Sequence, residues 1–215
     1  MTRLVALIAT TFLLGAAAFA QTLKPLDQSA KDPKLAELIA TLIKACDRKD
    51  FKPFEAALSP DAIGSFGGDP GVRGFKVDHD IDSPGTTFYT KFKDAVSMGG
   101  AFTDVRTFAA PYVFALWPDD LDGFEWIAAT GSKTMLYAKP ENGAKTLADV
   151  THQFLEFASE APYARDAAPA GWLHVKAGRT TGYVKESQAR SPTDYRAVFE
   201  KVDGRWRLRA FVAGD

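Results

Sequence analysis

The fold of the second half of this sequence is decided by two neighbouring runs, Gly171-Trp172-Leu173-His174-Val175 and Gly178-Arg179-Thr180-Thr181-Gly182-Tyr183-Val184. Both runs combine glycine with aromatic and β-branched residues, a composition that is typical of short strands. A turn that contains glycine lies between them. The pattern therefore predicts two short strands that are joined tightly.

Further apolar positions lie upstream, in Thr134-Met135-Leu136-Tyr137-Ala138-Lys139-Pro140. Together with the Gly-Trp and Gly-Tyr-Val runs, this segment resembles a bacterial SH3-like (SH3b) domain. The resemblance implies a small SH3-like β-barrel over residues 126–192, with strands at 134–137 and within 147–157. The sequence departs from the family pattern in Met135-Leu136-Tyr137-Ala138, which replaces Leu-Asn-Val-Arg, and in an insert at 159–170 that is rich in alanine and proline.

The clearest local structure is a C-terminal β-hairpin over residues 193–215, where Asp203-Gly204 separates two alternating strands. Asp-Gly favours a type I′ turn, because both central residues of that turn need positive φ. A two-residue loop also fixes the register of the strands. We therefore expect the pairs Val202–Arg205, Lys201–Trp206, Glu200–Arg207 and Phe199–Leu208.

Alternation gives this hairpin an apolar face and a charged face. The apolar face carries Tyr195, Ala197, Phe199, Trp206, Leu208, Ala210 and Val212. The charged face carries Glu200, Arg205, Arg207 and Arg209. Guanidinium groups suit carboxylates, so the arginine row is either a site for a carboxylate-bearing partner or a solvated outer face, and the solvated face is the favoured interpretation.

Two helices are expected near the N-terminus. Behind the start signal Asp32-Pro33, apolar residues recur at three- and four-residue spacing, which predicts one buried helix face. These residues are Leu35, Leu38, Ile39, Leu42, Ile43 and Cys46. A second, shorter helix is expected at 50–58, closed by Ser59-Pro60.

The order of these helices and the hairpin pattern Phe-x-Lys-x-Asp-Gly-x-Trp-x-Leu resemble NTF2-like domains. The resemblance implies an α+β domain in which N-terminal helices pack on antiparallel strands. Either residues 22–125 and 193–215 form one such domain that encloses the barrel at 126–192, or the hairpin extends the barrel's own sheet. Both plans predict the α+β fold class.

The segment between these parts shows helical periodicity first and strand-like periodicity after it. Apolar spacing from Phe88 to Val96 predicts a helix that is capped by Ser83 or Thr86 and ends at Gly99-Gly100. Strands are then expected near 105–109 and 112–117, with a break at Pro111.

The first 20 residues have the features of a secretory signal peptide: Arg3, an apolar run from Leu4 to Phe19, and the cleavage pattern Ala18-Phe19-Ala20. The apolar run is shorter than the ~20 residues that cross a bilayer, and no cysteine follows for a lipid anchor. We expect cleavage after Ala20 and a soluble, periplasmic or secreted protein without a membrane anchor.

Charge and cysteine content exclude some functions. The chain has 26 Lys and Arg against 27 Asp and Glu, which gives no basic surface for a nucleic-acid partner. Cys46 is the only cysteine, so no internal disulfide can form. A catalytic thiolate needs a nearby base and a helix N-terminus, whereas Cys46 lies near the other end of its helix. We expect a buried thiol.

The stretch most like a metal site is Asp78-His79-Asp80-Ile81-Asp82. Carboxylates at alternate positions suit calcium, which makes Asp78, Asp80 and Asp82 weak candidates. An EF-hand loop, however, has glycine sixth and glutamate twelfth, and Ser83 and Tyr89 stand there. A solvated acidic turn is the favoured interpretation, and neither a metal nor a cofactor is expected.

Four aromatic residues are candidates for a ligand-binding groove: Tyr137, Tyr163, Trp172 and Tyr183. Aromatic grooves recognise extended or cell-wall peptides because flat rings bind such chains at low entropic cost. The alternative is that the rings pack the core of the small barrel, and for Trp172 we expect the core. His152 and His174 are expected to be satisfied strand histidines.

These patterns favour an exported, non-enzymatic binding or scaffold protein of the cell envelope. Its SH3b-like part would contact a peptidoglycan peptide or an envelope protein. The alternative is a small-molecule-binding or hydrolytic NTF2-like domain that uses Asp61, Asp78, His79 or Asp80 around a conical pocket. A purely structural role is a third hypothesis.

Overall fold

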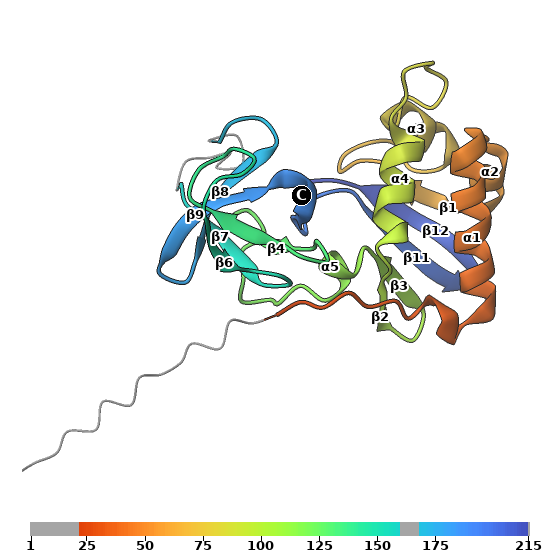
Figure 1. Cartoon of the computed structure of the whole chain (residues 1–215). Helices are drawn as coiled ribbons and strands as arrows, with labels where there is room; N and C mark the ends of the chain where they lie inside the picture. The colour runs from red at the N-terminus through yellow and green to blue at the C-terminus, as the bar shows by residue number, and fades with distance from the viewer. Residues whose placement is uncertain (1–21, 160–167, 215) are drawn as a thin grey trace, which may run out of the picture.

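The protein consists of two lobes in a computed structural model that describes residues 22–159 and 168–214 (Figure 1). One lobe combines a five-stranded sheet with helices, and the other is built on a seven-stranded sheet. Helices and mostly antiparallel strands occur together, so the expected α+β fold class is confirmed. Residues 1–20, the expected signal peptide, lie outside the described ranges.

The first lobe takes its elements from both ends of the chain. Its helices are η1 (Ser29–Lys31), α1 (Pro33–Arg48), α2 (Lys52–Ala57), α3 (Val72–Asp78), α4 (Phe88–Ser97) and α5 (Tyr112–Ala115). Its strands are β1 (Leu58–Ile63), β2 (Ala101–Asp104), β3 (Thr107–Ala110), β11 (Arg196–Val202) and β12 (Arg205–Val212). Helices α1 and α4 lie side by side over the sheet (Figure 1).

Helix α1 forms where the sequence predicts it. The Asp32 side chain accepts hydrogen bonds from the amides of Lys34 and Leu35, and Pro33 occupies the first helical position, where its missing N–H has no cost. The helix ends at Lys49, whose φ is +50°. The buried side chains on one face are Leu35, Ile39, Leu42, Ala45 and Cys46, so the expected apolar face is confirmed.

The strand order of the first sheet is β1-β12-β11-β3-β2. The last strand of the chain pairs in parallel with β1, and β11 pairs antiparallel with β3. The C-terminal hairpin therefore lies in the sheet of the N-terminal part, and it does not extend the sheet formed by residues 126–190. The second lobe is an excursion of the chain between β3 and β11.

The expected hairpin register is confirmed in the four pairs nearest the turn, from Val202–Arg205 to Phe199–Leu208. A β-bulge follows, because Val198 pairs with Ala210 and leaves Arg209 as an extra residue. An extra residue reverses the alternation beyond it. Phe211 consequently joins the main core cluster, and our assignment of Ala210 and Val212 to that apolar face was wrong.

Aromatic rings fill the space between this sheet and its helices. Phe54 packs against Phe88 and Phe92, with ring centroids 4.9 Å apart in both pairs. Phe211 from β12 contacts the same two rings, at 5.6 and 5.2 Å. Edge-to-face contacts of this kind add to the stabilisation that burial provides. The helices are thus held on the sheet by a continuous group of phenylalanines.

The second lobe contains β4 (Trp126–Ala129), β5 (Met135–Tyr137), β6 (Thr146–Asp149), β7 (Phe154–Phe157), β8 (Trp172–Ala177), β9 (Thr180–Lys185) and β10 (Ala189–Arg190). Its strand order is β10-β4-β7-β8-β9-β5-β6. The tightly joined strands expected from the Gly-Trp and Gly-Tyr-Val runs are β8 and β9, which pair antiparallel over six positions.

The expected closed barrel is not found. Strand β10 has two residues and pairs only with β4, and β6 pairs only with β5 within the described residues. The two outer strands are not joined, so the sheet stays open in its hydrogen bonding. It still buries a core of its own, formed by Ile127, Ala129, Leu136, Val150, Leu155, Phe157, Leu173, Val175 and Val184.

The strand expected at 112–117 is also wrong, because residues Tyr112–Ala115 form the short helix α5. Short apolar runs do not distinguish a strand from a buried helical turn by periodicity. Tyr112 and Val113 of this turn pack with Ala128 of the second lobe and Leu23 of the N-terminal segment. Leu23 also donates its amide hydrogen to the His152 carbonyl at 2.7 Å, so the N-terminal segment contacts both lobes.

Among the residues that the structure describes, no helix is both long enough and apolar enough to cross a lipid bilayer. The longest helix, α1, has a polar face with Lys34, Glu37 and Lys44.

Asp32 provides a test of the contact between α1 and the hairpin. Its second carboxylate oxygen lies 2.7 Å from Lys201 Nζ on β11, and this ion pair lowers the pKa of Asp32 from 3.8 to about 2. A carboxyl group whose pKa is lower in the folded state stabilises that state above its unfolded pKa. The contribution is lost as the pH falls from 3.8 to about 2.

We expect Asp32→Asn to be less stable than wild type at neutral pH, because asparagine keeps the helix cap but removes the charge that pairs with Lys201. The stability difference should shrink as the pH falls through 3.8 towards 2, measured by urea unfolding with tryptophan fluorescence. Lys201→Met, which removes the same pair, should show the same trend. A difference that does not change with pH would show that the pair contributes nothing.

Candidate functional site

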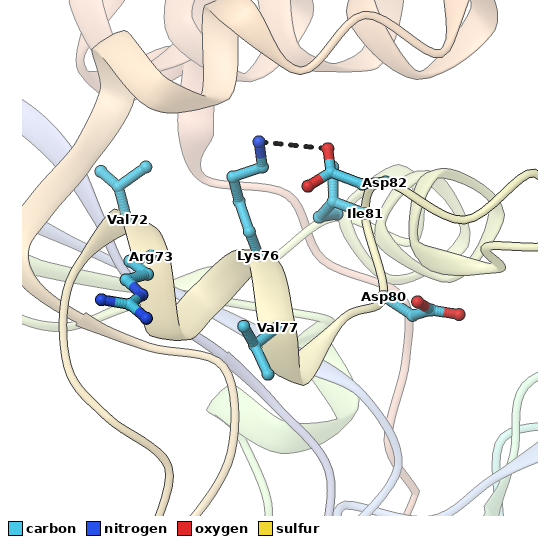
Figure 2. Close-up of a pocket in the computed structure, with 7 residues that line it drawn as sticks. All are labelled: Val72, Arg73, Lys76, Val77, Asp80, Ile81 and Asp82. Atoms are coloured by element: carbon cyan, nitrogen blue, oxygen red, sulfur yellow. Dashed lines mark ion pairs between the residues drawn. The ribbon is translucent and has the colours of Figure 1, made fainter.

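The acidic segment that follows α3 does not assemble a metal site. Asp82 lies 3.1 Å from Lys76 Nζ, and Figure 2 shows this ion pair while Asp80 points away from it. Within the described ranges, no three His, Cys, Asp or Glu residues come together as a possible metal site. The three candidate carboxylates Asp78, Asp80 and Asp82 thus fail to converge.

A shallow groove of about 590 Å³ lies along α3 beside this segment. Figure 2 shows its lining side chains, which mix aliphatic groups such as Val72 and Val77 with Arg73, Lys76 and Asp82. Lys76 and Asp82 already neutralise each other. The groove therefore offers neither a continuous apolar surface nor a charge of one sign.

The residues of the hydrolytic hypothesis lie in different environments. Asp61 on β1 faces solvent, accepts a hydrogen bond from Ser59 at 2.6 Å and pairs with Arg209 at 3.3 Å. Asp78 packs under the loop that contains Gly64 and Gly68, where a Cβ on Gly68 would lie 2.3 Å from Asp78 Oδ2. Asp61 therefore lies in a different environment from Asp78, whereas Asp78 and Asp80 line one small cavity with His79.

His79 is the one member of that hypothesis with an unusual environment. Its side chain is 7 % exposed and its ring packs 4.5 Å from Phe75 and 5.2 Å from Phe211. Nε2 lies 2.9 Å from the Phe211 carbonyl oxygen. Burial lowers the pKa of His79 from 6.5 to about 4, so the ring is neutral at pH 7 and is a poor general acid there.

A group of aromatic side chains lies on one surface of the second sheet. Alternation along β8 turns Leu173 and Val175 into the core, which leaves Trp172 and His174 on the other surface. His174 is opposite Tyr183 of β9, and Tyr183 is opposite Tyr137 of β5. Three adjacent strands thus place four rings on one surface.

These rings contact one another and stay partly exposed. Tyr137 and Trp172 meet edge to face with centroids 5.5 Å apart. His174 and Tyr183 stack at 4.5 Å with planes 13° apart. We call Tyr137, Trp172, His174 and Tyr183 the aromatic face. Lys185 Nζ lies 6.0 Å from the Trp172 ring centroid, within the range of a cation–π contact.

The structure brings together three of the four expected ligand-binding residues, Tyr137, Trp172 and Tyr183. The fourth, Tyr163, lies outside the described residues. Our assignment of Trp172 to the core was wrong, because the core side of β8 is taken by Leu173. His174 was missed as a member of this group, although its spacing of two from Trp172 in a strand gives both residues the same face.

The arginine row of the hairpin is largely engaged by the protein itself. Arg207 donates a hydrogen bond to the Ala56 carbonyl at 2.8 Å, and Arg209 donates to the Asp61 carbonyl at 2.6 Å. Arg209 also pairs with the carboxylates of Asp61 and Glu200. These guanidinium groups fasten β12 to its neighbours, which supports the interpretation of a structural outer face.

Cys46 is a core residue. Its side chain is 6 % exposed, and burial raises the pKa of its thiol from 9.0 to about 12. A thiol with this pKa contains almost no thiolate at neutral pH, and the thiolate is the reactive form. The expected burial of the thiol is confirmed.

We expect native Cys46 to resist alkylation by iodoacetamide at pH 8 and to react only when α1 leaves the sheet. The labelling rate, followed by mass spectrometry, should rise in urea along the same transition as tryptophan fluorescence. Rapid labelling of the native protein would contradict the burial of this thiol.

We expect the His79 ring to remain neutral well below pH 6.5 and to titrate with a midpoint of about 4. A histidine whose pKa falls on folding favours the folded state above pH 6.5, and this contribution is lost as the pH falls towards 4. The ¹H–¹³C shift of the His79 Cε1 group measures the midpoint, and His79→Phe assigns the signal. A midpoint near 6.5 would contradict the buried environment.

The chain was also compared with known proteins by sequence and by structure. No protein-family model matches it, and no curated protein or solved structure matches it either. Any function assigned to this protein therefore has to come from its own side-chain chemistry and geometry.

Proposed function

We propose that this protein is an exported, non-enzymatic binding or scaffold protein of the cell envelope. The second lobe contacts a cell-wall peptide or an envelope protein through the aromatic face. The observation that carries the proposal is the convergence of Tyr137, Trp172, His174 and Tyr183 from three adjacent strands on one partly exposed surface.

Rings on the surface of a sheet are suited to bind an extended chain. Each ring offers a large apolar area with few rotatable bonds, so little side-chain entropy is lost on binding. Contacts between the rings, at 5.5 and 4.5 Å, hold them in place before a ligand arrives. Preorganisation of this kind increases affinity without additional contacts.

Charges beside the aromatic face favour a ligand with carboxylates. Lys185 lies next to Trp172, whereas the charge of Lys176 on the same surface is balanced by Glu156 at 3.0 Å. Lysine ammonium groups at the border of an aromatic surface attract carboxylates of a peptide chain. Cell-wall peptides combine a short extended backbone with several carboxylates and so match both features.

The sequence supports both the proposed location in the cell envelope and the proposed class of binding protein. The Gly-Trp and Gly-Tyr-Val runs resemble SH3b domains, and they form two of the three strands of the aromatic face, β8 and β9. The signal-peptide pattern before Gln21 agrees with an envelope ligand. A non-enzymatic role agrees with the separated carboxylates Asp61 and Asp78 and with the high pKa of Cys46.

A second candidate function is small-molecule binding by the first lobe, in line with its resemblance to NTF2-like domains. One observation favours it: the buried ring of His79 borders a small polar cavity. A hydrolytic version would need a base that ionises near neutral pH, whereas the pKa of His79 is about 4.

We expect purified mature protein to co-sediment with isolated sacculi, and Trp172→Ala and Tyr183→Ala to weaken this binding. Truncation of an aromatic residue at the centre of an interface costs about 2 kcal/mol or more, which is a loss of roughly 30-fold in affinity. Phe124→Ala is the matched control, since Phe124 is an exposed aromatic residue, 60 % exposed, outside the aromatic face.

Each variant should keep the wild-type unfolding midpoint within a few degrees, because the aromatic face lies outside the core of the lobe. Two results would overturn the proposal. One is wild-type protein that neither co-sediments with sacculi nor binds solubilised envelope proteins. The other is equal retention of wild type, Trp172→Ala and Tyr183→Ala.

A further inference from the structure

A small polar cavity of about 190 Å³ lies in the first lobe, at the end of α3 and the beginning of α4. His79, Asp80, Thr86, Lys91 and Tyr195 are among the residues that line it. This volume is below the ~300 Å³ of sites for drug-sized ligands. The cavity therefore suits one small, polar molecule.

The tautomer of His79 places a hydrogen-bond acceptor at this cavity. The Phe211 carbonyl can only accept a hydrogen bond, so Nε2, 2.9 Å away, carries the proton. The pKa of about 4 keeps the ring neutral, and Nδ1 therefore bears a lone pair. Within the described residues Nδ1 accepts no hydrogen bond, and 7 % of the surface of His79 stays exposed.

The positively charged side chain of Lys91 also lines this cavity. Lys91 Nζ is 4.6 Å from the Tyr195 ring centroid, and within the described part of the chain it forms no ion pair. Lys91 belongs to the first turn of α4, a ten-residue helix whose N-cap residue, Thr87, makes no side-chain capping bond. Thr86 Oγ1 already accepts a hydrogen bond from the first amide of α4, that of Phe88, at 3.3 Å, so the group that favours a negative charge here is Lys91.

Asp80 adds a negative charge. It is exposed, has φ of +48° and lines the cavity together with His79. Asp78 also lines the cavity, and its Oδ2 is buried without a hydrogen-bond partner among the described residues. The cavity thus offers acceptors, from His79 Nδ1 and the carboxylates of Asp78 and Asp80, together with a cationic donor, Lys91. A ligand that satisfies both the acceptors and Lys91 is a small molecule that carries a cationic donor and a carboxylate.

From this arrangement we propose that the cavity binds a free α-amino acid with a small side chain. The ammonium group donates to His79 Nδ1 and to the Asp80 carboxylate, and the carboxylate binds Lys91 in the first turn of α4. This site is separate from the aromatic face and independent of its function.

The test uses three probes that differ by one charged group: alanine, propionate without the ammonium, and ethylamine without the carboxylate. Calorimetry on the mature protein should show alanine binding, with both analogues weaker by about 10-fold or more, because a hydrogen bond to a charged group contributes about 1.5–3 kcal/mol. Alanine should also shift the His79 Cε1 and Nδ1 NMR signals.

Lys91→Met should weaken alanine binding by about 10-fold or more and keep the fold, because Lys91 lies on the helix surface. Asp80→Asn should weaken alanine binding and leave propionate unchanged. Trp172→Ala should bind alanine like wild type, which separates this site from the aromatic face. The inference is overturned if alanine at millimolar concentration leaves the His79 signals unmoved, if propionate binds as well as alanine, or if Lys91→Met has no effect.

Discussion

The pairing of β12 with β1 is the constraint on which this structure depends. It joins the last strand of the chain to the first strand of the N-terminal part, with Leu58 opposite Leu208 and Ile63 opposite Ala210. The chain can close the first sheet only after it has passed through the whole second lobe. Contacts between such distant residues carry a large loop-closure entropy, which burial of the aromatic core has to offset.

This closure also shapes the cavity beside His79. The bulge after Val198 turns Phe211 into the core, and the Phe211 carbonyl then fixes the His79 ring through Nε2. The C-terminal strand thus determines the tautomer of the histidine at the C-terminal end of α3. Tyr195, which leads into β11, contributes the wall on which Lys91 rests. The final hairpin therefore supplies part of the lining of this cavity.

The second lobe separates its two surfaces by simple alternation. Leu173 and Val175 enter the core, while Trp172 and His174 remain outside and meet rings from β9 and β5. Its core and the aromatic face therefore come from the same short strands. The N-terminal segment connects this lobe to the first, since Leu23 packs with Tyr112 and Ala128.

The sequence alone determined the local structure. The Asp32-Pro33 start of α1, the burial of Cys46, the tight β8–β9 pair and the hairpin register around Asp203-Gly204 all depend on neighbours within a few residues, where capping, periodicity and turn geometry act. The same rules placed Tyr137 and Tyr183 in strands, though they do not show which strands become neighbours.

Only the tertiary structure decided the rest. The bulge that buries Phe211, the open order of the seven-stranded sheet and the helical turn at Tyr112–Ala115 result from long-range packing that local pattern does not encode. The meeting of Tyr137 with Trp172, and of His79 with Lys91 and Tyr195, likewise requires strands and helices distant in sequence to be neighbours. Sequence periodicity defines which face a residue occupies, whereas the pairing of elements defines what that face meets.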